Sequence, residues 1–223
     1  PNVVDAMTSN EGSVRIAYDQ FQARPVVGEP GTGWRPLRDA DLAILRCELE
    51  RRGFKAVGPE IMKSSVAVLG ERFKFDSAID WANGLQWDGV PRVTMALHRF
   101  YGVEDSPYTR AVSEYLFTAL AGRCLDPGCQ ADMVPILIGA QGARKTSAII
   151  ALAPTPDVFV KINLGKRDED LSRRLRGKLV AELPELRGLT GRDIQGIRDW
   201  VTNRTESLVD KYQTYESTYP RRF

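Results

Sequence analysis

The residues best suited to chemistry lie in a glycine-containing loop, Gly139-Ala-Gln-Gly-Ala-Arg-Lys-Thr146. The loop follows an apolar run, residues 133–138, and precedes residues 146–153, whose composition predicts a helix. Backbone N–H groups of such a loop, with the open N-terminus of the next helix, attract anions. Lys145 would reach the outer phosphates of a nucleotide, and Thr146 would bind Mg²⁺. The spacing therefore predicts a phosphate-binding loop.

One position of this loop departs from the pattern G-x-x-x-x-G-K-[ST], which requires glycine where the chain has Arg144. Glycine there normally allows backbone freedom and a close approach to phosphate. We expect arginine to be tolerated if its backbone already has helical φ and ψ angles, and its guanidinium could contact a phosphate. The residues expected to bind nucleotide are Gly139, Gln141, Gly142, Ala143, Arg144, Lys145, Thr146 and Ser147.

A second stretch ends a short apolar run with an acid. Leu179-Val-Ala181 predicts a buried strand, and Glu182 follows it directly. In phosphate-loop ATPases a carboxylate in this place holds Mg²⁺, directly or through water, and a second carboxylate, here Glu185, can orient the attacking water. The pattern is common by itself. The pattern supports an ATPase site because it follows the glycine loop at a distance that leaves room for one strand and one helix between the loop and Glu182.

Composition indicates an ordinary soluble protein. The chain has 223 residues, 43% of them hydrophobic and 27% charged, which suffices for one large or two small domains. A formal net charge of +2 gives no general electrostatic reason to bind nucleic acid. The three cysteines form no CxxC pair and His98 is the single histidine, so neither a zinc site nor a disulfide framework is predicted. No apolar run approaches the roughly 18 residues of a membrane span.

Residues 1–105 are expected to form a mainly helical region. The alternating residues 13–18 leave room for a short hairpin, whereas residues 24–33 are rich in glycine and proline and predict a loop. The predicted helices of this region begin at Asp39, at Pro59, after an Asp76 cap and after Pro91.

Residues 106–223 are expected to form an α/β region, a P-loop ATPase core. Its helix at 107–124 has the longest clear apolar periodicity of the chain. About three sheet strands are predicted, near 133–138, 158–162 and 178–183. Another helix should begin at Thr190, and the polar tail after it should be irregular.

Four short motifs accompany these features in a fixed order: Trp87-Asp-Gly-Val-Pro-Arg92, Pro127-Gly-Cys-Gln-Ala-Asp132, Glu182-Leu-Pro-Glu185 and Tyr219-Pro-Arg-Arg222. In order and spacing they resemble the virulence-associated E family, over roughly residues 75 to 223. That family is similar to the helicase halves of phage and mobile-element primase–helicases. None of the four motifs is specific to the family by itself, but their combination is fairly specific.

The resemblance implies a P-loop ATPase core related to superfamily-three helicases, which are usually oligomeric rings that move on DNA. It implies ATP and Mg²⁺ as cofactors, single-stranded or forked DNA as a partner, and a homo-oligomeric ring in the full-length protein. It also implies the cytoplasm of a bacterial or phage-infected cell, with no membrane association. Lys145 and Thr146 match the family's nucleotide-loop lysine and its Mg²⁺-binding hydroxyl.

The same resemblance assigns the remaining catalytic residues. Glu182 and Glu185 match the paired acids of the second motif, with Glu182 also a metal ligand. Arg221 or Arg222 matches a basic pair that could act as an arginine finger toward a neighbouring subunit, and the choice between them stays open. Family members continue into further strands, so we expect a core truncated at its C-terminus.

The leading expectation is the motor domain of a DNA helicase or primase–helicase that hydrolyses ATP during DNA replication of a phage-like mobile element. Arg144 and the truncation motivate an alternative, a non-catalytic nucleotide-binding or protein-interaction module. A kinase-like phosphotransferase ranks last, because no acceptor-binding motif is visible.

Overall fold

The computed structural model describes residues 2–8, 15–29, 33–162, 171–184, 191–209 and 216–223. The chain divides into two compact units, unit 1 (Pro1–Asp80) and unit 2 (Trp81–Phe223), earlier than the boundary expected after residue 105. No helix in the described ranges is both long and apolar enough to cross a membrane.

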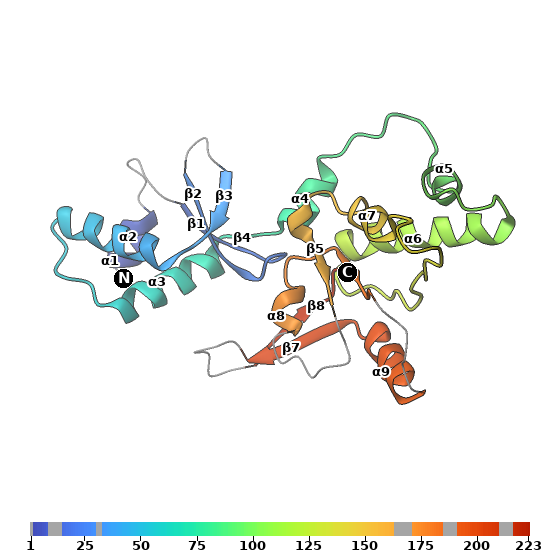
Figure 1. Ribbon diagram of the computed structural model, residues 1–223. Helices are drawn as coiled ribbons and strands as arrows, with labels where there is room; N and C mark the ends of the chain where they lie inside the picture. The colour runs from blue at the N-terminus through green and yellow to red at the C-terminus, as the bar shows by residue number, and fades with distance from the viewer. Residues whose placement is uncertain (1, 9–14, 30–32, 163–170, 185–190, 210–215) are drawn as a thin grey trace. The chain divides into compact units, whose positions relative to one another are not determined.

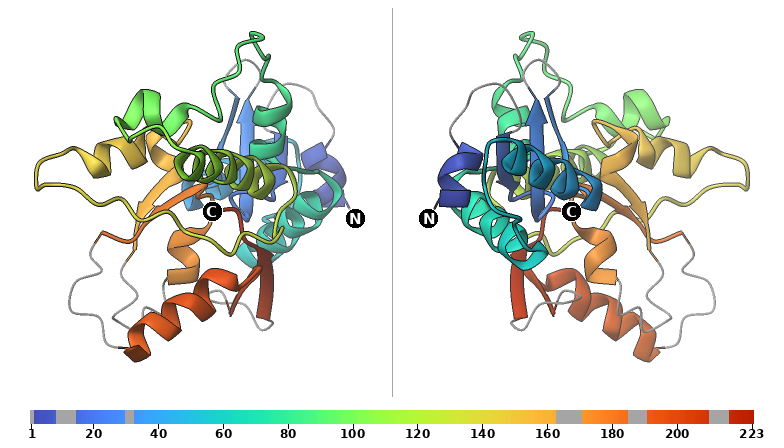
Figure 2. Two further views of the ribbon diagram at one scale, coloured as in Figure 1. Left: turned by 90° about the vertical axis from the view of Figure 1, so that its right-hand side faces the viewer. Right: turned by 90° about the vertical axis from the view of Figure 1, so that its left-hand side faces the viewer.

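Unit 1 combines a four-stranded sheet with helices. Its elements are α1 (Asn2–Thr8), β1 (Arg15–Asp19), β2 (Arg24–Glu29), β3 (Gly33–Pro36), α2 (Asp39–Arg51), α3 (Pro59–Arg72), β4 (Lys74–Phe75) and α4 (Ser77–Asn83), whose last residues pass into unit 2. The strand order is β3-β2-β1-β4, antiparallel except for the parallel pair β1–β4. The helices α1, α2 and α3 lie on one side of this sheet (Figures 1 and 2).

This sheet is larger than the short hairpin that was expected in the mainly helical region. The segment predicted as a loop forms β2, because Val26 and Val27 are fully buried and pair with Ala17 and Ile16 of β1. Gly28 is required there for packing rather than for a turn, since a Cβ atom at this position would lie 2.8 Å from the Trp34 ring. The composition of the segment therefore misled the sequence-based prediction.

The helices of unit 1 form where the local signals placed them. Pro59 occupies the first turn of α3, and the Asp76 carboxylate accepts hydrogen bonds from the N–H groups of Ala78 (3.2 Å) and Ile79 (3.0 Å) at the start of α4. The helices cover a core made by seven buried apolar residues: Ile16, Leu45, Leu49, Val57, Met62, Val66 and Leu69.

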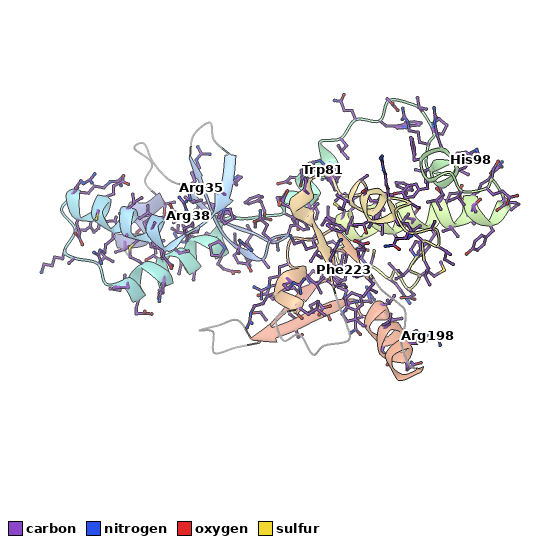
Figure 3. The ribbon with its side chains drawn as sticks, in the orientation of Figure 1. Arg35, Arg38, Trp81, His98, Arg198 and Phe223 are labelled. Carbon is purple, nitrogen blue, oxygen red and sulfur yellow. The ribbon has the colours of Figure 1, made fainter. Side chains whose placement is uncertain are left out.

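The helix α2 begins at Asp39, as expected, and its N-cap residue is Arg38. The Asp41 carboxylate accepts a hydrogen bond from the Arg38 N–H at 2.8 Å and two from the Arg35 guanidinium at 2.7 and 2.9 Å. Both arginines lie beside this helix start (Figure 3). Because the Arg35 hydrogen bonds favour the charged form, they hold the pKa of the buried Asp41 carboxyl well below its usual range.

Unit 2 contains the remaining elements: α5 (Ala96–Tyr101), α6 (Pro107–Leu125), α7 (Lys145–Ile150), a 3-10 turn (Pro156–Val158), β5 (Phe159–Lys161), α8 (Leu171–Leu175), β6 (Val180–Glu182), α9 (Gly191–Thr202), β7 (Thr205–Val209) and β8 (Glu216–Pro220). The strands β5 and β6 form a parallel pair, and β7 and β8 form an antiparallel hairpin. The long helix α6 confirms the predicted helix at 107–124.

Two strand predictions in unit 2 are confirmed and one is wrong. β5 and β6 lie within the predicted ranges, whereas residues 133–138 form no strand. Four of their side chains are exposed, from 54% for Val134 to 94% for Ile138, and Pro135 and Leu137 are partly buried. Residues 203–212, expected to be irregular, include β7, which pairs with β8. Within the described residues unit 2 is a mixed α/β unit with two small sheets.

Candidate functional site

The glycine loop lies between the extended residues 133–138 and α7. Gly142 has a φ angle of +82° and Arg144 one of +56°, and the Ala143 N–H donates to the Ala140 carbonyl at 3.3 Å. Arg144 is the N-cap residue of α7 and has left-handed φ and ψ angles, not the right-handed helical ones under which arginine was expected to be tolerated. The glycine of the sequence pattern is therefore the residue that this backbone favours.

The Lys145 ammonium group is folded back onto the start of the loop. Its Nζ atom donates to the carbonyl oxygens of Gly139 (2.8 Å) and Ala140 (2.9 Å). These two acceptors are neutral and solvent-exposed. An anion in the loop can therefore compete for the ammonium, because a charge-assisted hydrogen bond is roughly twice as strong as one between neutral groups.

The loop and the second predicted motif meet directly. The Thr146 hydroxyl donates to the Glu182 carboxylate, with 2.6 Å between Oγ1 and Oε1, although the two residues are 36 positions apart. Glu182 is the last residue of β6 and is only 6% exposed. The parallel pair β5–β6 thus places a buried carboxylate at the start of α7.

The second carboxylate oxygen of Glu182 is the main unsatisfied group of this site. Oε2 is buried and has no hydrogen-bond partner among the described residues. The Lys161 Nζ atom lies 3.8 Å from this oxygen, on the neighbouring strand β5 at the position paired with Glu182. Lys161 was missed by the sequence analysis, because only the register of β5 against β6 brings it to the carboxylate.

These oxygen atoms fit Mg²⁺. The ion prefers hard oxygen ligands and is commonly held by one or two protein groups together with phosphate and water, and the Thr146 hydroxyl and Glu182 carboxylate supply such a pair. Within the described ranges, no cluster of three or more histidine, cysteine or acidic residues could enclose a metal. A binding site made jointly with a ligand's phosphates suits this donor set.

A tyrosine supports the helix behind the loop. The Tyr101 hydroxyl at the end of α5 donates to the Ala148 carbonyl of α7 at 2.8 Å, and burial raises the pKa of Tyr101. This hydrogen bond ties α7, the helix that follows the loop, to the end of α5. It could not have been predicted, since no local pattern connects residues 47 positions apart.

The two arginines expected to act as a finger are instead buried within unit 2. Arg221 is 2% exposed, contacts Glu206 at 2.5 Å, donates to the Trp200 carbonyl and lies over the Trp200 ring. Arg222 is 7% exposed and donates to the Cys124 carbonyl at 3.0 Å. An arginine finger projects toward another subunit, whereas both of these arginine side chains are buried, so the finger role stays a prediction.

The structure therefore gathers part of the predicted site. Lys145, Thr146 and Glu182 come together around the loop. Three further residues predicted to bind nucleotide are exposed along it: Gln141, Ala143 and Ser147. Glu185 lies outside the described residues.

Comparison with protein families identifies unit 2. The family model described as the virulence-associated protein E-like domain matches residues 82–223. The chain belongs to this family. The match contains the glycine loop, the Glu182 motif and both C-terminal arginines, and it confirms the resemblance seen in the sequence. A search of curated proteins finds no match.

Proposed function

We propose that unit 2 is the nucleotide-binding core of a Mg²⁺-dependent ATPase, the motor domain of a DNA helicase or primase–helicase that serves replication of a phage-like mobile element. The single observation that carries the ATPase part is the 2.6 Å contact between Thr146 and Glu182. It joins the two stretches of sequence that a phosphate-loop ATPase needs close together. Membership of the virulence-associated protein E-like family supports the motor role.

The residues have distinct tasks in this proposal. The Lys145 ammonium exchanges the carbonyls of Gly139 and Ala140 for phosphate oxygens. The Thr146 hydroxyl turns from Glu182 toward the metal site, and the Glu182 carboxylate provides the negative charge that holds a cation there. Mg²⁺, when bound, neutralises charge that develops on the phosphates. Lys161 balances the buried carboxylate while no cation is bound.

Nucleotide binding is tested by titrating the chain with a fluorescent ATP analogue and Mg²⁺. Lys145→Ala should weaken binding about 30-fold or more, because it removes a charge-assisted contact worth about 2 kcal/mol or more. Lys63→Ala is the matched control, since Lys63 is an exposed lysine of unit 1 paired with Glu60. Equal affinities of the Lys145→Ala variant and the unchanged chain would exclude the loop as the nucleotide site.

Turnover is tested separately, by ATPase assays on the full-length protein with and without DNA. Glu182→Gln keeps the size of the side chain but removes its charge, so it should abolish Mg²⁺-dependent hydrolysis while leaving Mg²⁺-independent nucleotide binding within a few-fold of the original affinity. Stimulation by DNA and assembly into a ring, measured by light scattering, test the motor and oligomer parts of the proposal.

A second candidate function is a nucleotide-binding module without turnover. The burial of Arg221 and Arg222 favours it, because no arginine finger is then presented from these positions. Under this alternative the chain binds ATP analogue and Mg²⁺, but the full-length protein shows equal, background rates with glutamate or glutamine at position 182. Measurable hydrolysis that depends on Glu182 excludes it.

A further inference from the structure

A second feature of unit 2, apart from the glycine loop, is a buried arginine that forms no ion pair with an acid among the described residues. Arg123 lies in the last turn of α6 and is 3% exposed. Its Nε and NH1 atoms are buried and have no hydrogen-bond partner among the described residues. Burial also lowers the pKa of Arg123, because the charged form loses its hydration.

The surroundings of Arg123 are rich in positive charge. Arg204 is held beside the loop that follows α6, because its Nε atom donates to the Gly128 carbonyl at 2.6 Å and its own carbonyl accepts the Arg221 N–H at 2.9 Å. Its charge lowers the pKa of Arg123 further. Arg221 is also near. The carboxylate of this region, Glu206, is already engaged by Arg221 and by the Ser172 hydroxyl at 3.0 Å. It therefore does not neutralise Arg123.

Other groups near Arg123 offer little compensation. Asp132 is exposed, and its carboxylate takes a hydrogen bond from the Gln130 amide at 2.5 Å. Tyr115 accepts the N–H of Met133 at 2.9 Å, and Cys129 packs against Gly122 of α6. None of the three accepts a hydrogen bond from the buried Nε or NH1 atom of Arg123.

A buried guanidinium with unsatisfied donors is costly to a fold unless an anion pairs with it. The flat fork of arginine donors matches an oxyanion with several equivalent oxygens, and two neighbouring guanidinium groups match two negative charges. We propose that Arg123 and Arg204 bind a dianionic phosphoryl group, either inorganic phosphate or a phosphomonoester. The site joins the end of α6 to the loop before residue 133 and to the start of the β7–β8 hairpin, and it uses none of the residues of the glycine loop.

The test is thermal unfolding of the chain in the Lys145→Ala background, which weakens phosphate binding at the glycine loop. Inorganic phosphate is compared with sodium chloride at equal ionic strength. A phosphate concentration about 100 times its Kd should raise the Tm by roughly 5 °C or more. Arg123→Met should unfold at a higher temperature than its parent in chloride, because it removes an unpaired buried charge, and phosphate should not shift its Tm.

A second variant keeps the proposal testable if Arg123→Met does not fold. Arg204 is exposed, so Arg204→Met should fold normally and lose most of the phosphate shift, whereas the exposed Arg198→Met on α9 should keep it. Repeating the titration with adenosine 5′-monophosphate identifies the source: a shift at lower concentration than phosphate assigns a phosphomonoester, and a shift with phosphate alone assigns the free ion. The proposal is overturned if neither ligand shifts the Tm, or if the shift persists in folded Arg123→Met or Arg204→Met.

Discussion

Arg144 shows most clearly how a single residue sets the properties of the glycine loop. A left-handed backbone costs an ordinary residue about 1–2 kcal/mol, and glycine avoids that cost. The chain keeps arginine at φ = +56° directly before Lys145, where its guanidinium is exposed. The backbone strain thus lies at the position where a phosphate would approach. Backbone strain of this kind is frequent at functional sites.

We expect Arg144→Gly to stabilise unit 2 by about 0.5 kcal/mol. The relief of backbone strain exceeds the extra entropy that glycine gives the unfolded chain. Arg99→Gly, inside α5, is the matched control and should cost about 1 kcal/mol, because glycine is a poor helix former. Urea unfolding measures both. A loss of stability in Arg144→Gly as large as that in Arg99→Gly would show that the left-handed conformation carries no strain.

The buried Asp41 predicts a pH dependence of unit 1. Its pKa is lowered in the folded chain, so the stability it contributes is complete above the unfolded-state pKa, near 4, and is lost as the pH falls below that value. Asp41→Asn should cost about 2 kcal/mol at pH 7, since it weakens hydrogen bonds to Arg35 and leaves that charge less compensated. Urea unfolding at several pH values should show this difference shrinking toward pH 3. Glu71→Gln, at an exposed pair with Lys74, should change little at any pH.

At the scale of elements, helices were predicted better than strands. The signals for α3 and α6 are local: a proline in the first turn and an apolar face at helical spacing. A strand also needs a partner. Residues 133–138 have the composition of a buried strand but pair with nothing among the described residues. Conversely, the polar segment 205–209 becomes a strand because residues 216–220 pair with it.

Prediction of the candidate site was also limited to features with a local sequence pattern. Lys145, Thr146 and Glu182 could be proposed from spacing, because phosphate-binding loops have a pattern. Lys161 and Tyr101 could not, because their contacts depend on strand register and on helix packing. Arg221 was assigned a role at the surface, but its burial follows from contacts with Trp200 and Glu206 that no sequence pattern reveals.

The structural role of Arg221 is directly testable. Arg221→Ala should destabilise unit 2 by about 3 kcal/mol or more, because it leaves Glu206 without its partner in a half-buried place and removes the packing on the Trp200 ring. Arg198→Ala, an exposed arginine on the same helix as Trp200, should change stability by less than about 0.5 kcal/mol (Figure 3). Chemical unfolding followed by tryptophan fluorescence measures both. An unchanged midpoint for Arg221→Ala, with impaired ATPase activity in the full-length protein, would support the finger role.

At the scale of the whole molecule, the two units differ in how well they bury their apolar side chains. Unit 1 has a continuous apolar core formed by its helices and β1. Unit 2 leaves large apolar side chains exposed over several segments, among them Trp87 at 78% and Ile138 at 94%. Since buried apolar area is the main source of stability, unit 2 is expected to be the less stable of the two.

Calorimetry should therefore resolve two unfolding transitions. The lower one should belong to unit 2 and rise by roughly 5 °C or more when ATP and Mg²⁺ are present at about 100 times their Kd, because the proposed nucleotide site lies in that unit. The upper one should respond to Asp41→Asn and not to nucleotide. If calorimetry shows a single transition, and nucleotide and Asp41→Asn both shift it equally, the two units unfold as one.

The exposed run at residues 133–138 also has a consequence for the colloidal behaviour of the protein. It reads Met-Val-Pro-Ile-Leu-Ile, and apart from its proline this uncharged, apolar composition is typical of segments that stack between chains into fibrils. Pro135 lies inside it, and proline cannot donate a hydrogen bond to a neighbouring strand. This residue therefore acts as a gatekeeper against aggregation, and the protein keeps an apolar segment open to solvent without offering neighbouring molecules an uninterrupted edge.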